Sequence, residues 1–313
     1  MNIRLKDVSL ILKLSRQAIH KQQKRQISKQ LLLNETIGLC DQMRAKHPRM
    51  GLKKIYHHYK SDLSVGRDKF IELATTGGYR LKRLRAPHKT TVATRLATPP
   101  NLIDGLVLTR CNQLWQSDIF YLQVGKRHMY GVTIIDVYSR RLLALHVSKT
   151  MKANDVYHAL KKAIKTRTKE SIRGCIFHSD RGRQYMSEKL RSLFTSLDIH
   201  QSMCKRAQQN SYCERVQGTV KNEYLMHLNI NERNIINTAA KVKNLYNNER
   251  YHLELSLRTP MEFERYINNL QESKRPKTHI YQWIEPELTK IDLINKKEKS
   301  SKKEKTTTTN TSL

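Results

Sequence analysis

The spacing of hydrophobic and polar residues divides the chain into three parts. Apolar positions recur at helical intervals within residues 5–79, show no sustained period over residues 80–100, and gather into short strand-like runs from Leu114 onward. Three of these runs are separated only by short polar breaks, and they cover residues 115–124, 130–139 and 142–148. The pattern predicts three consecutive strands joined by tight turns, which is an antiparallel meander.

Helices and strands alternate after the meander. The sequence predicts a helix over about 154–168, a strand near 174–177, a helix over about 185–197, a short strand near 198–203 and a helix from about Ser211. A meander followed by alternating helices and strands is the order of ribonuclease-H-like proteins. We therefore expect an α/β fold of this kind.

The front of the chain is predicted to form two small helical modules. Ser15 is placed to cap a helix that follows a short apolar one, a helix-turn-helix-like pattern, and residues 48–60 and 65–80 repeat the arrangement up to Gly77 and Gly78. The modules are rich in Arg and Lys, which favours contact with DNA over the alternative of a solvated bundle with charged outer faces. Four residues are the expected DNA contacts here: Arg16, Lys53, Lys54 and Arg67.

Composition sets the expected boundaries. The chain is predicted to comprise helical DNA-binding modules over residues 1–79, a basic linker over 80–107, an α/β core over 108–268 and a basic C-terminal extension over 269–313. From about residue 296 the extension is too polar and repetitive to bury a core, so we expect it to be disordered.

Charge points to a polyanionic partner. The 59 Lys and Arg residues exceed the 27 Asp and Glu residues and give a formal net charge of +32. Binding to nucleic acid through such an excess weakens steeply with added salt. No run approaches the length of a transmembrane helix, and the first residues lack the apolar core of a secretory signal. We expect a soluble cytoplasmic protein, associated with the nucleoid and not with a membrane.

The cysteines and histidines do not predict a zinc site. The five cysteines are widely spaced and include no C-x-x-C pair, so reduced and mostly buried thiols are expected. His57 and His58 are adjacent, but no cysteine pair follows at the spacing of zinc ligands. We expect both histidines on a helix surface near DNA.

Three acidic residues stand in distinctive contexts: Asp118 in W-Q-S-D-I-F-Y, Asp180 in F-H-S-D-R-G and Glu214 in S-Y-C-E-R-V. Aspartate is disfavoured inside a strand, so Asp118 among apolar neighbours is either a surface residue or one compensated by a metal ion. Asp180 directly follows an apolar strand, where α/β proteins often place ligand-binding groups, although S-D-R-G is also an ordinary turn sequence. Carboxylates suit Mg²⁺ or Mn²⁺, and two such ions can catalyse phosphodiester displacement. We predict that the three carboxylates bind two ions.

Neighbouring residues are expected to have other roles. Glu223 lies nine residues after Glu214, about half a helical turn out of phase, so we expect it to make a structural contact. Lys221 shares the helix face of Glu214 and is expected to bind a phosphate beside the metals. Three more residues are weighed and not expected among the ligands. Asp155 near a helix start is expected to be a cap-region residue, and Asp136 to lie beside the ligands at most. His178, two residues before Asp180, is close enough to assist the site, but a lone histidine is as often a packing or hydrogen-bonding residue.

Taken together, the motifs resemble those of the DDE transposases of the IS-three family of bacterial insertion sequences, the product of the second reading frame. The resemblance covers nearly the whole chain. It includes W-Q-S-D with Asp118, V-T-I-I-D-V-Y-S-R-R, H-S-D-R-G-R-Q-Y with Asp180, the N-x-x-x-E pattern that ends at Glu214, and Y-N-N-E-R-Y-H-L-E-L-S-L-R-T-P over residues 246–260.

The resemblance implies a retroviral-integrase-like catalytic core that cleaves and transfers DNA strands at the ends of the element. Asp118, Asp180 and Glu214 would then be the catalytic metal ligands, with Mg²⁺ or Mn²⁺ as cofactor. The expected partners are DNA, further copies of the chain on paired ends, and the product of the upstream reading frame. Arg250 and His252 of the last motif are expected to pack or to touch DNA.

The chain departs from the family near the third acidic residue. The family usually has D-N-A where this chain has Gln209, Asn210 and Ser211, and the 33 residues between positions 180 and 214 are slightly fewer than usual. The position of Glu214 therefore depends on this loop.

Two alternatives stay open, namely a nuclease that cuts without joining and a DNA-binding protein that has lost catalysis.

Overall fold

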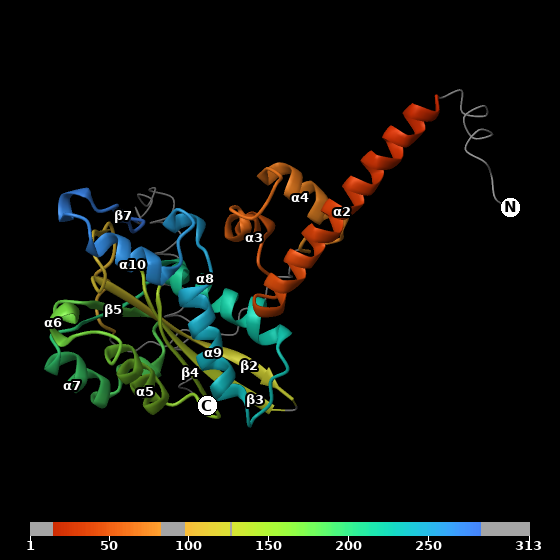
Figure 1. Ribbon diagram of the computed structural model, residues 1–313. Helices are drawn as coiled ribbons and strands as arrows, with labels where there is room; N and C mark the ends of the chain where they lie inside the picture. The colour runs from red at the N-terminus through yellow and green to blue at the C-terminus, as the bar shows by residue number, and fades with distance from the viewer. Residues whose placement is uncertain (1–14, 83–97, 126, 283–313) are drawn as a thin grey trace, which may run out of the picture.

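A five-stranded sheet and a group of N-terminal helices make up the described part of the chain, residues 15–82, 98–125 and 127–282 of a computed structural model (Figure 1). The strands of the sheet lie in the order β4-β3-β2-β5-β6. Their bounds are β2 Leu114–Val124, β3 Arg127–Asp136, β4 Leu142–Ser148, β5 Ile176–Ser179 and β6 His200–Met203.

The pairing of these strands confirms the predicted meander and its continuation. Strand β3 pairs antiparallel with both β2 and β4, whereas β5 pairs parallel with β2, and β6 pairs parallel with β5. The parallel pairs require crossovers, which helices provide. An antiparallel meander extended by two parallel strands next to its first strand is the ribonuclease-H-like arrangement that the sequence predicted.

Helices cover both faces of the sheet. Their bounds are α5 Ala153–Ile164, α6 Lys169–Ile172, α7 Glu188–Ser196, α8 Ser211–Thr219, α9 Ile235–Asn248 and α10 Pro260–Asn268. Short helical turns η1 Arg183–Met186, η2 Ala207–Asn210, η4 Leu225–His227, η5 Leu253–Leu255 and η6 Glu272–Lys274, together with the π-helical segment η3 Val220–Tyr224, complete the set. A small second sheet pairs β1 Val107–Leu108 with β7 Thr278–His279.

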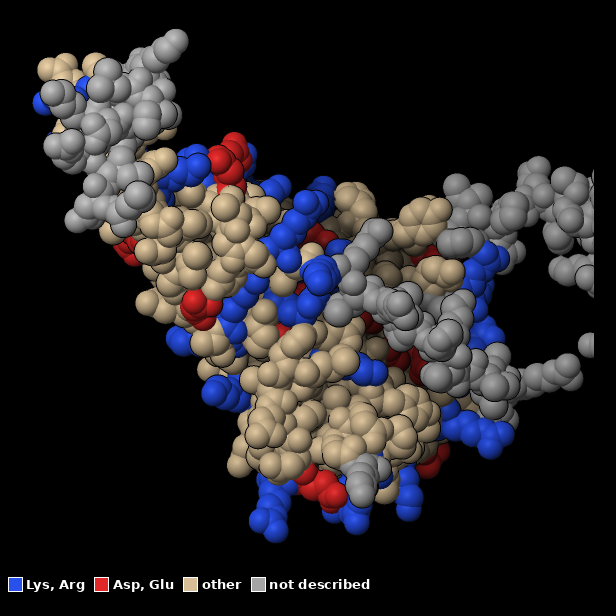
Figure 2. All heavy atoms as spheres, turned by 90° about the vertical axis from the view of Figure 1, so that its right-hand side faces the viewer, with Lys and Arg blue, Asp and Glu red and all other residues tan. Residues whose placement is uncertain are grey.

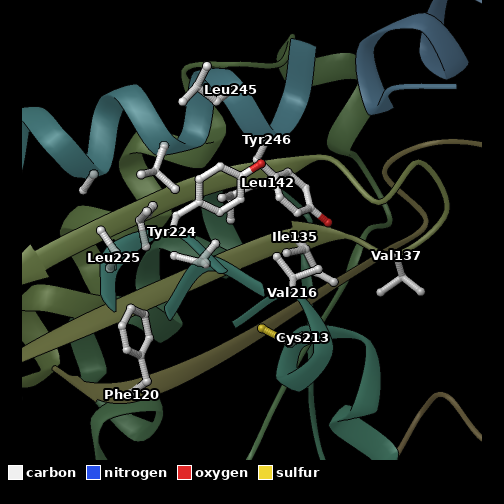
Figure 3. Close-up of a cluster of buried hydrophobic side chains, with 14 of the residues drawn as sticks. Phe120, Ile135, Val137, Leu142, Cys213, Val216, Tyr224, Leu225, Leu245 and Tyr246 are labelled. Atoms are coloured by element: carbon white, nitrogen blue, oxygen red, sulfur yellow. The ribbon is translucent and has the colours of Figure 1, made fainter. Parts of the chain in front are cut away.

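Two hydrophobic cores hold these layers together. One lies between the sheet and helices α5 and α7 and includes Trp115 and Phe177. The other lies on the opposite face, where Cys213 and Val216 of α8 and Tyr246 of α9 pack with residues of the sheet (Figure 3). Side chains alternate between the faces of a strand, so β2 contributes to both cores.

The N-terminal helices form a third core of their own. Helix α2 (Arg16–Lys46) begins at Ser15, whose side chain accepts a hydrogen bond from the backbone N–H of Ala18, as predicted for a helix cap. Its C-terminal half packs with α3 (Leu52–Tyr59) and α4 (Arg67–Thr76) around Phe70, whereas its N-terminal half projects away from the molecule (Figure 1). The first helix of the helix-turn-helix-like pattern falls in residues 1–14, outside the described residues.

Hydrogen bonds join the N-terminal helices to the core. His47 Nδ1 lies 2.7 Å from the hydroxyl oxygen of Tyr224, and His58 Nδ1 lies 3.1 Å from that of Tyr251. The ring of His57 also packs edge-on against Tyr251. His57 and His58, expected on a surface near DNA, therefore contact the core directly, a partner that sequence periodicity does not reveal.

Other expectations have mixed outcomes. All five cysteines are free thiols and four are buried, as predicted. The expected disorder from about residue 296 and most of the expected linker, residues 83–97, lie outside the described residues. The boundaries between the four expected segments stay a prediction.

Gly131 gives a test of the packing on β2 and β3. A Cβ atom at this position would lie 2.3 Å from ring atoms of Phe120, its directly paired neighbour. We expect Gly131→Ala to lower the free energy of unfolding by about 1–3 kcal/mol, because the buried ring must shift. Gly38→Ala is the control, since a Cβ there meets nothing within 4 Å inside α2 and should stabilise by up to about 1 kcal/mol. Urea titrations of both variants measure the difference, and equal stabilities would contradict the packing described.

Candidate active site

Strand β2 presents Asp118 toward helix α8. Asp118 is paired with Thr133 on β3, and it shares a strand face with Gln116 and Phe120, two residues away on either side. Cys213 of α8 lies against this face, with its sulfur 3.2 Å from the Thr133 hydroxyl. The Asp118 carboxylate is therefore held between the sheet and α8.

Helix α8 is tied to β2 by hydrogen bonds that sequence reasoning missed. The Gln116 side chain donates to the carbonyl of Gln209 at 2.9 Å and accepts from the backbone N–H of Cys213 at 3.1 Å. Asn210 donates to the carbonyl of Ser117 at 3.0 Å. The loop that departs from the family pattern is thus anchored, and the anchor lies beside the first turn of α8, where Glu214 stands. The only signal in the sequence was the position of Gln116, two residues before Asp118.

The parallel pairing of β2 and β5 brings Asp180 to the same place. Ser179, the last residue of β5, pairs with Ser117, so Asp180 follows at the level of Asp118. One oxygen of Asp180 accepts a hydrogen bond from the backbone N–H of Gly182 at 3.1 Å. The structure therefore gathers Asp118, Asp180 and Glu214 from three separate segments, where the carboxyl end of β5 meets the central strand β2. We call this group the carboxylate triad.

Burial and mutual repulsion disfavour the charged form of the triad. Burial raises the pKa of Asp118 to about 7, and the negative charges of Asp180 and Glu214 add to the rise. Hydrogen bonds from Ile119 and Gln217 oppose it, and none of these main influences is a cation. Burial also raises the pKa of Asp180. Two half-buried carboxylates with raised pKa values beside a third carboxylate fit a divalent cation, because hard oxygen ligands are what Mg²⁺ and Mn²⁺ bind.

A second group of potential ligands shows the contrast. Cys111, Asp136 and Glu264 have ligand atoms within 4.8 Å of one another, closer than the atoms of the triad come within the part of the chain described. Here, however, arginines supply the positive charge: Arg167 lies 2.5 Å from Glu264 and 3.5 Å from Asp136, and Arg141 lies 2.6 Å from Glu264. Asp136 also accepts backbone hydrogen bonds. The arginines therefore already neutralise these carboxylates, and the cluster is a buried ion-pair network rather than a metal site.

The residues expected to have structural roles do so. Glu223 faces away from the triad and forms an ion pair with Arg250 at 2.7 Å. Asp155 lies in the first turn of α5 and accepts a hydrogen bond from the backbone N–H of Lys152, the residue before the helix, at 2.9 Å. His178 is fully buried and bonds to the Ser202 hydroxyl at 2.9 Å, and burial lowers the pKa of its imidazole to about 4.

The predicted DNA contacts lie in different places. Lys221 lines an open groove between the β2–β3 hairpin and the segment after α8. Tyr121 and Gln123 of β2 line the same groove. Arg16 and Arg67 are exposed at the starts of α2 and α4, and Arg67 pairs with its neighbour Asp68. Lys53 is exposed on α3, whereas Lys54 is half-buried against the core. All five stay predictions as DNA contacts.

Comparison with known proteins agrees with this geometry. Residues 109–209 match the integrase core domain family. Over these residues the chain is similar to integrase core domains. The matched segment includes Asp118 and Asp180 and ends before Glu214, so the third carboxylate rests on the structure and the sequence pattern.

Two curated relatives cover much more of the chain. It is 23% identical over 251 residues to "Transposase for insertion sequence element IS904" of Lactococcus lactis, covering 78% of this chain and 97% of the relative. It is 29% identical over 214 residues to "Insertion element IS600 uncharacterized 31 kDa protein" of Shigella sonnei, covering 66% and 78%. The predicted relationship to insertion-sequence transposases with an integrase core is confirmed, and the narrower IS-three assignment stays a prediction.

Among solved structures, the HTLV-2 integrase catalytic core domain aligns with 50% of this chain and 97% of its own, at a TM-score of 0.39 and 20% identity. None of the described helices has the length and apolar character needed to cross a membrane.

The raised pKa of Asp118 predicts a pH-dependent stability. The folded state holds a proton on Asp118 up to about pH 7, whereas an unfolded aspartate releases it near pH 4, so without metal the fold loses stability as the pH rises between these values. Asp118→Asn removes this penalty, and we expect it to raise the free energy of unfolding at about pH 8 by roughly 2–4 kcal/mol, with little change at about pH 4.

Urea unfolding in the presence of a chelator measures this effect. Asp62→Asn, at an exposed position in the turn after α3, is the control and should change stability little at either pH. Addition of Mg²⁺ should stabilise the wild-type protein at the higher pH and leave Asp118→Asn nearly unchanged. A variant that is less stable than wild type at the higher pH would contradict the repulsion described.

Proposed function

We propose that the protein is a transposase that cleaves DNA strands at the ends of an insertion element and joins them to target DNA. The observation that carries the proposal is the carboxylate triad, three acids from separate segments, of which Asp118 and Asp180 are half-buried with raised pKa values and Glu214 is exposed beside them. Its relatives named as transposases and the integrase core support the same activity. The formal net charge of +32 suits a DNA substrate.

Asp118, Asp180 and Glu214 would hold the metal ions. Divalent ions, two in the mechanism we propose, make an attacking oxygen more nucleophilic and stabilise the leaving oxygen of a phosphodiester. The protein's own part is to position these ligands and to keep them charged. The polar side chain of Gln217 beside Asp118 lowers its pKa and so favours its ionised form, while the anchored loop at Gln209 fixes the start of α8. The same site would serve cleavage by water and then attack by the freed 3′-hydroxyl, with no covalent link to the protein.

The partners follow from this chemistry. Joining two element ends to one target needs two active sites, so we propose that copies of the chain act together on paired ends. Lys221, which lines the groove beside β2, would bind a phosphate of the DNA strand that leaves the site. The role of an upstream reading-frame product stays a prediction from the family resemblance.

Substitution of the triad tests the proposal. With labelled DNA that carries the ends of the element, in Mg²⁺ or Mn²⁺, we expect wild type to give nicked and joined strands. Asp118→Asn and Glu214→Gln should each lower the rate at least about a hundredfold, since each removes a ligand of the reacting metal. Glu223→Gln, on the same helical segment but facing Arg250, is the matched control and should keep most of the activity.

The results of this experiment distinguish a transposase from a nuclease and from a DNA-binding protein. Circular dichroism of every variant confirms that loss of product is not loss of folding. Cleaved but never joined strands from wild type would identify a nuclease, and DNA binding with no metal-dependent product would identify a DNA-binding protein. A fully active Glu214→Gln beside an inactive Glu223→Gln would assign the third ligand to Glu223.

A further inference from the structure

A pocket of about 310 Å³ lies where the N-terminal helices meet the core. Its wall includes Tyr212, Arg215 and Thr219, which follow one stripe of α8. Cys213 and Gln217, which face Asp118, lie on the opposite side of the same helix. The pocket and the triad are therefore separated by the thickness of one helix.

Four cationic side chains converge on this pocket from four segments of the chain: Lys54 of α3, Arg140 after β3, Arg215 of α8 and Arg250 after α9. Only two carboxylates, those of Glu223 and Glu254, line it with them. On the face that Figure 2 shows, Lys and Arg side chains also gather in the middle of the view, with few Asp or Glu beside them. The pocket therefore carries a net positive charge.

The arginines have partners and the lysine does not. Arg250 pairs with Glu223 at 2.7 Å, while Arg140 and Arg215 share the single carboxylate of Glu254 at 3.1 and 3.7 Å. For the ammonium of Lys54, no ion pair or hydrogen bond with another described residue is present. A half-buried ammonium that forms no ion pair is costly, and the more distant charges of Glu223 and Glu254 offset only part of this cost, so Lys54 is the group that would gain most from an anion.

Titration behaviour of the neighbours agrees with this charge excess. Burial and then the charge of Arg250 lower the pKa of Lys54 to about 7. The imidazole of His252, which also lines the pocket, has its pKa held far below the usual range by burial and by the same four cations. An anion in the pocket would relieve both effects.

We propose that this pocket binds a backbone phosphate of the DNA strand that enters the candidate active site. The inference rests on the proposed function for its choice of DNA as the anion. Glu214 and Arg215 are adjacent and both exposed on the first turns of α8, so a strand that crosses this end of the helix can reach the triad on one side and the pocket on the other. The Lys54 ammonium and the Arg215 guanidinium would contact the phosphate oxygens, as cations do in non-specific DNA binding.

The proposal also gives the N-terminal helices a role beyond recognition. Lys54 belongs to α3 and Arg215 to the catalytic core, so one phosphate would connect the two parts. A DNA strand bound in this way would fix the docking of the helices that His47 and Tyr224 already favour. The substrate would then be positioned jointly by both parts of the chain.

Neutral phosphate substitution in the DNA tests this contact. Single methylphosphonates are placed in turn at each position of a fluorescent duplex from the element's ends, and affinity is measured by anisotropy. Wild type should show one position near the cleavage site at which the neutral group weakens binding about three- to tenfold. On unmodified DNA, Lys54→Gln should bind more weakly than wild type by a similar factor, and the neutral group at that position should weaken its binding no further. The slope of its log affinity against log salt concentration should be smaller in magnitude by about one.

Two further variants serve as controls. Lys54→Arg keeps the charge and should keep the sensitivity, and Lys60→Gln, which removes an exposed charge just after α3, should leave it unchanged. A Lys54→Gln protein as sensitive as wild type at every position would overturn the inference. Cleavage of unmodified DNA by wild type, measured alongside, keeps the two proposals apart: its absence counts against the proposed function, and its presence with unchanged sensitivity counts against the phosphate pocket alone.

Discussion

The candidate site depends on the attachment of helix α8 to strand β2. Gln116 uses both ends of its amide to hold the carbonyl of Gln209 and the N–H of Cys213, and Asn210 holds the carbonyl of Ser117. Gln116 thus has a partner at each end of its amide, as most buried amides do. Because this attachment sets where α8 begins, it places Glu214 opposite Asp118, and it places Arg215 in the pocket on the other side of the helix.

Charge compensation separates structural from functional acids in this fold. Asp136 and Glu264 are buried, yet Arg141 and Arg167 neutralise them and lock α10 to the end of β3. Asp118 and Asp180 have no such cation among the main influences on them, and burial raises the pKa of both. The arginines neutralise one acidic cluster, whereas the raised pKa values of Asp118 and Asp180 favour a cation from solution at the other. In the basic pocket the charges are reversed: cations predominate in its lining, and Lys54 would be stabilised by a bound anion.

Local patterns in the sequence predicted the elements well, because strand and helix periods are properties of short segments. Apolar alternation located the strands that carry Asp118 and precede Asp180, and the half-turn phase argument placed Glu223 away from the triad even though a π-helical segment, Val220–Tyr224, interrupts the helix. Contacts between distant segments could not be predicted in this way. The docking of His58 on Tyr251 and the position of Lys54 depend on how separate parts pack, which no local period encodes.

The carboxylate triad is, in our proposal, the metal site of this protein. Crystals soaked in MnCl₂ would test it directly, because anomalous scattering locates manganese without reference to activity. We expect anomalous peaks between Asp118, Asp180 and Glu214. We expect no peak beside Asp136 and Glu264, because arginines form ion pairs with them. A peak at the second cluster with none at the triad would contradict it.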